Sequence, residues 1–269
     1  MTPVSAIVQT GPMPDHAPRT YVVTGAASGI GRATCELLST AGHRVVDVDL
    51  RDATITTDLA TPAGRAALVD AVTQATGGRV DAVIANAGVN APPELCVRVN
   101  YFGAVATLGS LRPLLAGADS PRAVATASSS VINAHDAALV AECLDGDEEA
   151  AAARAGRAGL AAYPSSKRAL ARWVRRQAPT DAWAGAGIAL NAVAPGIVQT
   201  PMTEPLFADE GMRALMADAV PMPYGGHARP EHVAELIAFL VAPTTARLTG
   251  QVVFVDGGAD AVLRGDDIW

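Results

Sequence analysis

The sequence predicts one α/β domain, a doubly wound parallel sheet with helices on both faces, and two observations support this. Short apolar segments alternate with longer helical segments through most of the 269 residues, which is the order that a parallel sheet covered by helices requires. A glycine-rich loop also follows the first apolar segment and precedes the first helix. No linker interrupts the alternation, so we expect a single domain over 19–269, preceded by a flexible extension over 1–18.

The expected elements follow from this alternation of short apolar runs and longer helical segments. Strands are expected at 21–24, 44–50, 80–85, 123–127, 190–193 and 252–255. Helices are expected near 32–41, 63–75, 100–115, 164–176 and 231–240.

Composition excludes several classes of protein. The net charge is −7 and the only basic grouping is Arg172, Arg175 and Arg176, so we expect no nucleic-acid partner. No apolar run approaches the ~18–20 residues of a membrane span, and the N-terminus lacks the pattern of a secretory signal. Three widely spaced cysteines indicate a reducing compartment, so we expect a cytoplasmic protein. No cluster of metal ligands is evident, so no metal is expected.

The first strand, loop and helix form a candidate dinucleotide-binding unit. The loop carries glycine at positions 25, 29 and 31. Glycines there allow a tight turn, let the backbone approach a pyrophosphate and pack the helix against the strand, while the helix start offers free N–H groups to the phosphates. A glycine-rich loop alone is a weak signal, but a strand, a helix and a second strand surround this one, as the fingerprint demands.

Asp49 ends the second strand, eighteen residues after Gly31. A carboxylate there can accept hydrogen bonds from both ribose hydroxyls of an adenosine, whereas a 2′-phosphate would meet a like charge. NAD is therefore favoured over NADP. Arg51 argues against this preference because it could turn inward to accept a phosphate, and Asp49 could alternatively be an ordinary acid of a surface turn.

A tyrosine and the chain's only lysine form a candidate catalytic pair. Lys167 follows Tyr163 by four positions, while every other basic residue is arginine. Residues four apart lie on one face of a helix. A cation beside a phenol lowers the phenol's pKa from ~10 towards neutrality, which makes it a usable general acid or base. The alternative is an ordinary pair on a helix surface.

These residues, together with the Asn-Ala-Gly segment at 86–88 and the Pro-Gly segment at 195–200, resemble the short-chain dehydrogenase/reductase family from about Thr20 to the C-terminus. The resemblance implies a Rossmann-type fold in which Asp58 receives the adenine amino group, the segment 86–88 closes the adenine-ribose pocket, and Val198 and Thr200 contact the nicotinamide carboxamide. The implied cofactor-binding residues are Gly25, Ser28, Gly29, Ile30, Gly31, Asp49, Leu50, Asp58, Leu59, Asn86, Ala87, Gly88, Tyr163, Lys167, Pro195, Gly196, Val198 and Thr200.

The same resemblance implies a catalytic tetrad of Asn100, Ser130, Tyr163 and Lys167. Tyr163 would exchange a proton with the substrate oxygen, Lys167 would hold the ribose diol and lower the tyrosine's pKa, and Asn100 would hold a relay water. Ser130, expected at the end of the strand, would hydrogen-bond the substrate oxygen and share its developing charge. Ser130 is preferred because Val131 follows it, as in the family pattern, and Ser129 is the alternative.

Two departures from the family pattern indicate a subgroup. Eleven residues separate Gly88 from Asn100, so the helix over that edge should be short or missing, and thirty-two separate Ser130 from Tyr163. The inserted segment 136–159 is acidic, rich in alanine and expected to be helical. These features resemble the bacterial 3α-hydroxysteroid dehydrogenase/carbonyl reductase type. The insertion disfavours the common homotetramer and favours a homodimer, although it could be an inert surface excursion.

The segment 201–226 corresponds to the family's substrate lid. It is rich in methionine and other apolar residues, which suits a hydrophobic cyclic alcohol or ketone such as a steroid or xenobiotic carbonyl. The same residues could instead pack against their own helix. The predicted function is NAD-dependent interconversion of a secondary alcohol and a ketone. Alternatives are a non-catalytic NAD-sensing or scaffold protein, and an epimerase or dehydratase, whose G-x-x-G-x-x-G loop and longer substrate domain are absent from this sequence.

Overall fold

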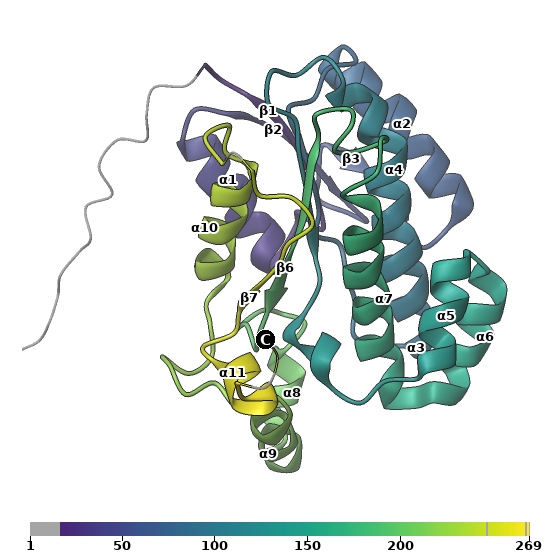
Figure 1. Ribbon diagram of the computed structural model, residues 1–269, viewed down its shortest axis with the longest axis vertical. Helices are drawn as coiled ribbons and strands as arrows, with labels where there is room; N and C mark the ends of the chain where they lie inside the picture. The colour runs from purple at the N-terminus through teal and green to yellow at the C-terminus, as the bar shows by residue number, and fades with distance from the viewer. Residues whose placement is uncertain (1–16, 246, 267, 269) are drawn as a thin grey trace, which may run out of the picture.

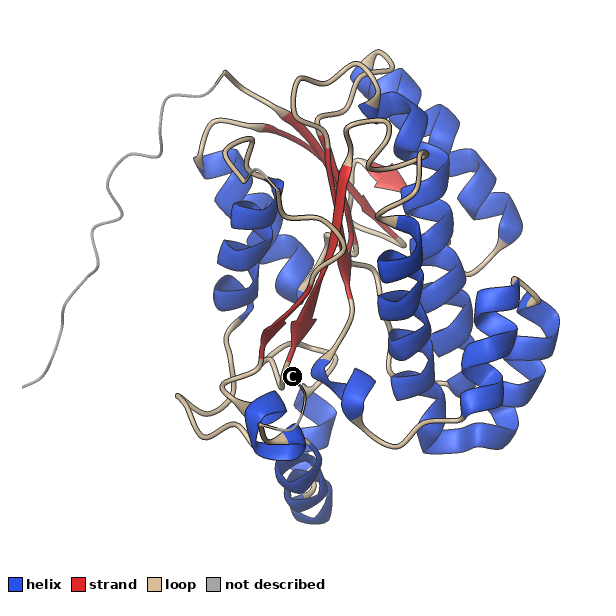
Figure 2. Ribbon diagram, in the orientation of Figure 1, coloured by secondary structure: helices blue, strands red, loops and turns tan. Residues whose placement is uncertain are grey.

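The computed structural model describes residues 17–245, 247–266 and 268. Residues 1–16 of the expected N-terminal extension, 1–18, lie outside the described residues. The described chain forms three layers, with helices on both faces of a central sheet (Figure 1, Figure 2). The predicted fold class, a single α/β domain with a doubly wound parallel sheet, is confirmed.

The sheet has seven strands, all parallel, in the order β3-β2-β1-β4-β5-β6-β7. The strand order reverses direction between β1 and β4, which leaves a crevice beyond the carboxyl ends of these two strands. Each predicted strand is present, and β3 is additional because two residues at a sheet edge carry no sequence pattern. The strands are β1 Thr20–Thr24, β2 Arg44–Asp49, β3 Ile55–Thr56, β4 Ala82–Ala85, β5 Arg122–Thr126, β6 Ala189–Pro195 and β7 Val252–Val255.

Helices cover the two faces of the sheet unequally (Figure 1). One face carries α1 and α10, which pack against each other, and the other carries α2, α4 and α7. Each face buries its own apolar cluster, so the central strands are apolar on both sides, as parallel strands covered by helices must be. The bounds are α1 Gly29–Thr40, α2 Pro62–Thr76, α4 Ala104–Leu115, α7 Ala162–Gln177 and α10 Pro230–Val241.

The predicted helix near 100–115 begins earlier than expected. It starts with α3, Pro93–Val97, and continues through a π-helical turn, η1, over Arg98–Gly103 before α4. Proline is favoured at the first position of a helix, where its missing N–H needs no partner. The helix expected to be short or missing over this edge is therefore the five-residue α3.

The inserted segment 136–159 is helical, as its composition predicts. It forms α5, Ala137–Asp145, and α6, Glu148–Ala158, which lie outside α3 and α7 (Figure 1). Asp136 and Asp147 cap the two helices through their side chains, a role that short acidic side chains fill well.

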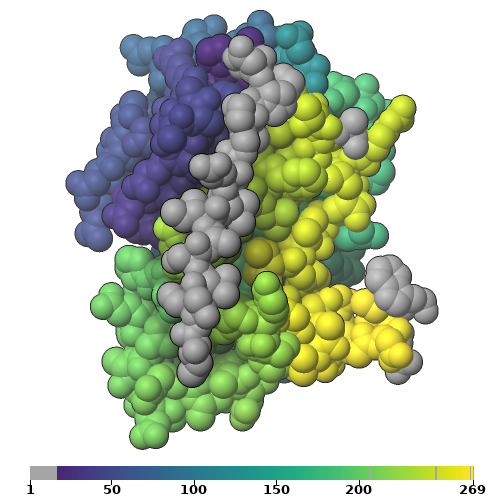
Figure 3. All heavy atoms as spheres, turned by 90° about the vertical axis from the view of Figure 1, so that its left-hand side faces the viewer, coloured from purple at the N-terminus to yellow at the C-terminus, as the bar shows by residue number. Residues whose placement is uncertain are grey.

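The segment 201–226 forms α8, Glu204–Ala208, and α9, Glu210–Ala219, beyond the carboxyl ends of the strands. Short 3-10 turns occur at η2, Ser129–Ile132, and at η3, Gly159–Ala161, and the last helix is α11, Ala259–Arg264. Figure 3 shows residues of the segment 201–226 in green and the C-terminal segment in yellow, side by side at one end of the molecule.

Candidate active site

A cavity of about 320 Å³ opens beyond the carboxyl ends of the strands, at the reversal of strand order. The loops after β1, β2, β4, β5 and β6 all contribute to its wall. Open α/β sheets bind ligands at this position. Its lining residues are Gly25, Ser28, Gly29, Ile30, Asp49, Leu50, Thr57, Asp58, Leu59, Asn86, Ala87, Gly88, Val89, Val99, Thr126, Ala127, Ser128, Tyr163, Lys167, Pro195, Gly196, Val198, Thr200, Pro201, Met202 and Thr203.

The glycine loop needs its glycines for steric reasons. Gly25 has a φ of +68°, and a Cβ there would lie 2.7 Å from the Ala87 Cα. A Cβ at Gly31 would lie 2.0 Å from the Gly25 carbonyl oxygen, so a side chain there would separate α1 from the loop. Ser28 precedes α1 and its side chain makes no capping hydrogen bond. The start of α1 therefore faces the cavity with no side-chain cap from Ser28, which is the arrangement that binds phosphate groups.

Asp49 is held by the backbone at the edge of the cavity. Its Oδ2 accepts a hydrogen bond from the Ala27 N–H at 2.9 Å, and its Oδ1 accepts one from the Leu50 N–H at 2.6 Å. Each carboxylate oxygen keeps capacity for a further donor. Arg51 is exposed, lies 4.0 Å from Asp52, and is not part of the cavity wall.

Asn86 joins three strands below the cavity. Its Nδ2 donates to the Thr24 and Gly25 carbonyl oxygens, while its Oδ1 accepts a hydrogen bond from the Thr126 hydroxyl at 3.1 Å. The Thr24 hydroxyl in turn accepts the N–H groups of Asn86 and Ala87. The loops after β1 and β4 are thereby fixed to each other by partly buried hydrogen bonds.

Tyr163 and Lys167 both line the cavity from α7, but their electrostatics differ from the prediction. Lys167 Nζ donates to the Thr126 carbonyl oxygen at 2.7 Å and lies 6.0 Å from the centre of the Tyr163 ring. Burial raises the pKa of the Tyr163 phenol above its usual value, and burial lowers the pKa of the Lys167 ammonium to about 8. The pKa of the Tyr163 phenol is thus raised and not lowered as expected, because burial is the largest cause and Lys167 is not among the causes of the shift.

Ser128, and not Ser130 or Ser129, is the serine at the cavity. Ser128 hydrogen-bonds the Tyr163 phenol, which opposes the rise in the phenol's pKa. Ser130 lies in the 3-10 turn η2, is absent from the wall, and its Oγ is buried without a hydrogen-bond partner. The strand ends at Thr126, so residue 128 continues the alternation of side chains that places Thr126 at this edge. The alternation of side chains along β5 is the sequence signal for Ser128, and the family pattern used to choose Ser130 did not include it.

Asn100 does not line the cavity. It lies in the π-helical turn η1, and both ends of its amide are engaged. Its Oδ1 accepts the Val89 N–H at 2.8 Å, while its Nδ2 donates to the Val89 carbonyl and to Ser166 Oγ. The side chain thus fixes the segment after β4, and the relay water expected from the resemblance stays a prediction.

The segment that follows β6 and leads into α8 forms one part of the cavity wall. Thr203 Oγ1 donates to the Val198 carbonyl oxygen at 2.6 Å and accepts the Thr200 N–H at 3.0 Å. Asn90 Nδ2 donates to the Met202 carbonyl oxygen, which joins this segment to the loop after β4. Of the predicted site residues, all but three line the cavity; Gly31 packs beneath it, and Asn100 and Ser130 lie elsewhere. Pro201, Met202 and Thr203 of the wall belong to the segment 201–226 expected as a lid. The wall residues that the prediction missed flank its motifs and are Thr57, Val89, Val99, Thr126, Ala127 and Ser128.

The described ranges, 17–245, 247–266 and 268, contain neither a candidate metal site nor a candidate membrane-spanning helix. No three His, Cys, Asp or Glu side chains gather there as a potential metal site. None of the helices in that part of the chain combines the length and the apolar character that crossing a bilayer requires.

Comparison with known proteins gives consistent matches over almost the whole chain. The family model described as Enoyl-(Acyl carrier protein) reductase matches residues 25–260. The chain is 38% identical to 3-alpha-hydroxysteroid dehydrogenase/carbonyl reductase of Comamonas testosteroni, over 90% of this chain and 97% of that protein.

Two solved structures are similar as well. The crystal structure of 3-alpha-hydroxysteroid dehydrogenase from Pseudomonas sp. B-0831 complexed with NADH has a TM-score of 0.87 and 40% identity, covering 92% of this chain and 99% of that one. A putative NAD(P)-dependent gluconate 5-dehydrogenase from Beutenbergia cavernae, with NADP bound at low occupancy, has a TM-score of 0.71 and 30% identity, covering 91% and 98%.

Proposed function

Because the chain belongs to the short-chain dehydrogenase/reductase family, we propose that it interconverts a secondary alcohol and a ketone with NAD(H) as its cofactor. As a member of the family it is an oxidoreductase acting on CH–OH or carbonyl groups. The observation that carries the proposal is Tyr163, a phenol that lines the same cavity as the glycine loop and Asp49.

The residues of the cavity fit a dinucleotide. Side chains at positions 25 and 31 would collide with backbone, so the loop keeps its close concave shape, and the start of α1 suits a pyrophosphate. The Asp49 carboxylate suits a ribose diol and disfavours a 2′-phosphate, so we propose NAD over NADP. Asp58 would receive the adenine amino group, and Asn86, Ala87 and Gly88 would close the pocket around the adenosine.

The remaining cofactor contacts are proposed on the nicotinamide side. Lys167 would donate to the ribose diol, and the Val198 backbone and the Thr200 hydroxyl would meet the carboxamide, at the wall formed after Pro195 and Gly196. When bound, the nicotinamide supplies a hydride for reduction of a ketone and accepts one in the reverse direction.

The catalytic residues of the chain manage the proton and the substrate oxygen. We assign to Ser128 the role expected of Ser130, because Ser128 contacts the Tyr163 phenol. Its hydroxyl would hydrogen-bond the substrate oxygen and share the charge that develops there. Tyr163, whose raised pKa keeps it protonated at neutral pH, would donate its proton to that oxygen as the ketone becomes an alcohol. Asn100 would act by fixing the loop after β4.

For the substrate, we propose a hydrophobic cyclic alcohol or ketone, such as a steroid or a xenobiotic carbonyl. The support is the apolar character of the lid segment 201–226, together with the steroid named for two of the similar proteins. The inserted helices α5 and α6 occupy the outer side of α7, and we propose a homodimer rather than a homotetramer, which sedimentation equilibrium would distinguish.

The function is tested by initial rates with NADH and NADPH across cyclic ketones and 3-ketosteroids, for the wild type and for Asp49→Ala. The wild type should prefer NADH, and the substitution should reduce that preference by about tenfold, the effect of losing roughly one charge-assisted interaction. An unchanged ratio would show that Asp49 does not face the ribose. Cofactor binding without turnover of any ketone would favour the alternative of a non-catalytic NAD-sensing protein.

A further inference from the structure

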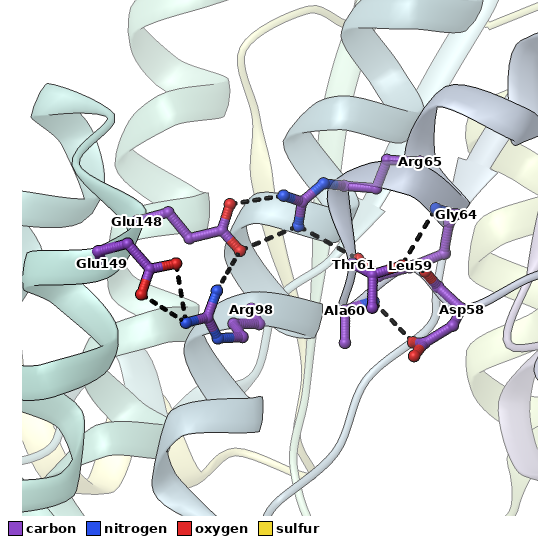
Figure 4. Close-up of polar contacts among 9 residues, drawn as sticks. All are labelled: Asp58, Leu59, Ala60, Thr61, Gly64, Arg65, Arg98, Glu148 and Glu149. Atoms are coloured by element: carbon purple, nitrogen blue, oxygen red, sulfur yellow. Dashed lines mark hydrogen bonds and ion pairs between the residues drawn. The ribbon is translucent and has the colours of Figure 1, made fainter.

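A cluster of charged side chains joins the inserted helix α6 to the loop that contains Asp58 and Leu59 (Figure 4). Glu148, the first residue of α6, lies between Arg65 of α2 and Arg98 of η1. Arg65 meets Glu148 through two parallel hydrogen bonds, of 3.1 Å and 2.5 Å, and Arg98 Nη1 donates to the same carboxylate at 3.1 Å. Arg65, Arg98 and Glu148 are called the α6 clamp below.

The clamp is shielded from water, which separates it from an ordinary surface ion pair. The Arg65 and Glu148 side chains are only 11% and 17% exposed. Two-pronged arginine–carboxylate pairs fix the orientation of both partners, and they are strongest where water is excluded. Glu149, by contrast, is 81% exposed and meets Arg98 alone.

Arg65 also holds the loop that forms the adenine end of the cavity. Its Nη1, already bonded to Glu148, donates to the Leu59 carbonyl oxygen at 3.3 Å. The Leu59 carbonyl oxygen also lies close to Gly103 of η1, because a Cβ added at Gly103 would be 3.1 Å from that oxygen. Leu59 and its neighbour Asp58 line the cavity, and Asp58 Oδ1 accepts the Ala60 N–H. Glu148 thus orients the Arg65 guanidinium, and Arg65 in turn orients the loop at Asp58 and Leu59.

We propose that Glu148 is a positioning residue for the adenosine half of the dinucleotide, acting through Arg65 on the backbone at Asp58 and Leu59. This inference rests on the proposed function, because it assumes that the cavity binds NAD(H). It gives the inserted segment 136–159 a part in cofactor binding, in place of an inert excursion.

The test is Glu148→Gln, which keeps the shape of the side chain but removes its charge and one of its two acceptor oxygens. Arg65 then loses part of its anchor, so the dissociation constant for NADH, measured by fluorescence titration, should rise about three- to tenfold. The kcat with saturating NADH should stay unchanged, because the reacting groups lie at the other end of the cavity.

Reduced nicotinamide mononucleotide separates positioning from a general loss of structure, because it lacks the adenosine half. Its kcat/KM as hydride donor should be the same in Glu148→Gln as in the wild type. Glu149→Gln is the matched control, and it should leave both cofactors unaffected. Equal weakening of NADH and the mononucleotide, or no weakening of either, would overturn the inference.

Arg65→Lys provides a second variant should Glu148→Gln fail to fold. A lysine keeps the cation but lacks the planar fork whose two terminal nitrogens bond the Glu148 carboxylate in parallel while one of them also donates to the Leu59 carbonyl, so the same selective loss of NADH affinity is expected. If the wild type binds no NADH, the proposed function fails along with the inference. If the wild type binds NADH and a folded clamp variant binds it equally well, only the inference fails.

Discussion

The half of the cavity proposed to hold the cofactor and the segment 201–226, proposed as a substrate lid, are built in opposite ways. Around the proposed cofactor half, partly buried hydrogen bonds between Thr24, Asn86 and Thr126 hold the loops in one arrangement. The lid helix α9 buries none of its ten residues. Segments with few buried contacts open at low free energy, whereas packed elements open only with the whole fold. Under the proposed function, we therefore expect the fold itself to set dinucleotide recognition, and the less buried helix α9 to contribute to substrate recognition.

We expect substitutions in the hydrogen-bonded half of the cavity, called the fixed half below, to slow the chemical step by a large factor. Tyr163→Phe removes the proton donor while keeping the ring, so kcat should fall by about 10²–10⁴-fold. Because the ring still fills the same space, the dissociation constant for NADH should change little. Stopped-flow turnover and fluorescence titration on the same preparation check this, and a variant retaining a large share of turnover would remove Tyr163 from its assigned role.

The next largest effect distinguishes two serines that lie two residues apart. Ser128→Ala should lower kcat by about 10²–10³-fold, as for loss of a donor to a developing oxyanion. Ser130→Ala is the matched control and should leave turnover close to wild type, because the Ser130 hydroxyl has no hydrogen-bond partner to lose. The reverse result, with Ser130→Ala inactive and Ser128→Ala active, would restore the motif-based assignment.

The pH profile should report on Lys167. Its pKa is lowered to about 8 by burial, so the ammonium is lost as pH rises through 8, and kcat/KM for NADH should then fall by up to about tenfold per pH unit. Between pH 8 and the higher pKa that Lys167 has in the unfolded chain, the unfolded chain binds more protons than the folded one. Lys167 therefore makes the free energy of unfolding rise with pH over this range. Unfolding linked to Lys167 therefore cannot explain the decline, which Tm measurements at each pH will verify. A flat profile up to pH 10 would contradict the assignment.

The smallest effect is expected in the lid. Met216 is half-buried on α9, and Met216→Ala should raise KM for a hydrophobic cyclic ketone about threefold, with a change of under about 1 kcal/mol in the free energy of unfolding. Leu215→Ala, at a 54% exposed position on the same helix, is the control and should change neither. If Met216→Ala lowers Tm by many degrees and leaves KM alone, α9 is part of the packed core and the comparison is wrong.

The sequence predicted the fixed half well because its requirements are local. Gly25 adopts a positive φ within its own turn, Gly31 is needed because a Cβ there would meet the Gly25 carbonyl six residues earlier, and Asp49 is the last residue of its own strand, β2. The sheet and its neighbouring helices followed from such patterns, and nearly all of the residues predicted to bind the cofactor line the cavity.

The parts that prediction missed depend on contacts distant in the chain or on small shifts in register. Ser130 was chosen because Val131 follows it, but the end of β5 at Thr126 decides which serine reaches the cavity. The lowered phenol pKa was inferred from spacing along a helix, whereas burial decides its direction. Arg65 and Glu148 are 83 positions apart, and no local pattern relates them.

The central claim is that the phenol of Tyr163 faces a bound nicotinamide where a substrate carbonyl is reduced. The most direct measurement supplies NADH carrying deuterium at both C4 positions and analyses the product alcohols from the cyclic ketone panel by mass spectrometry. The account predicts one deuterium on the carbinol carbon per NADH consumed, with none formed by Tyr163→Phe above its residual rate. NADH that binds tightly but keeps its label with every ketone would contradict it.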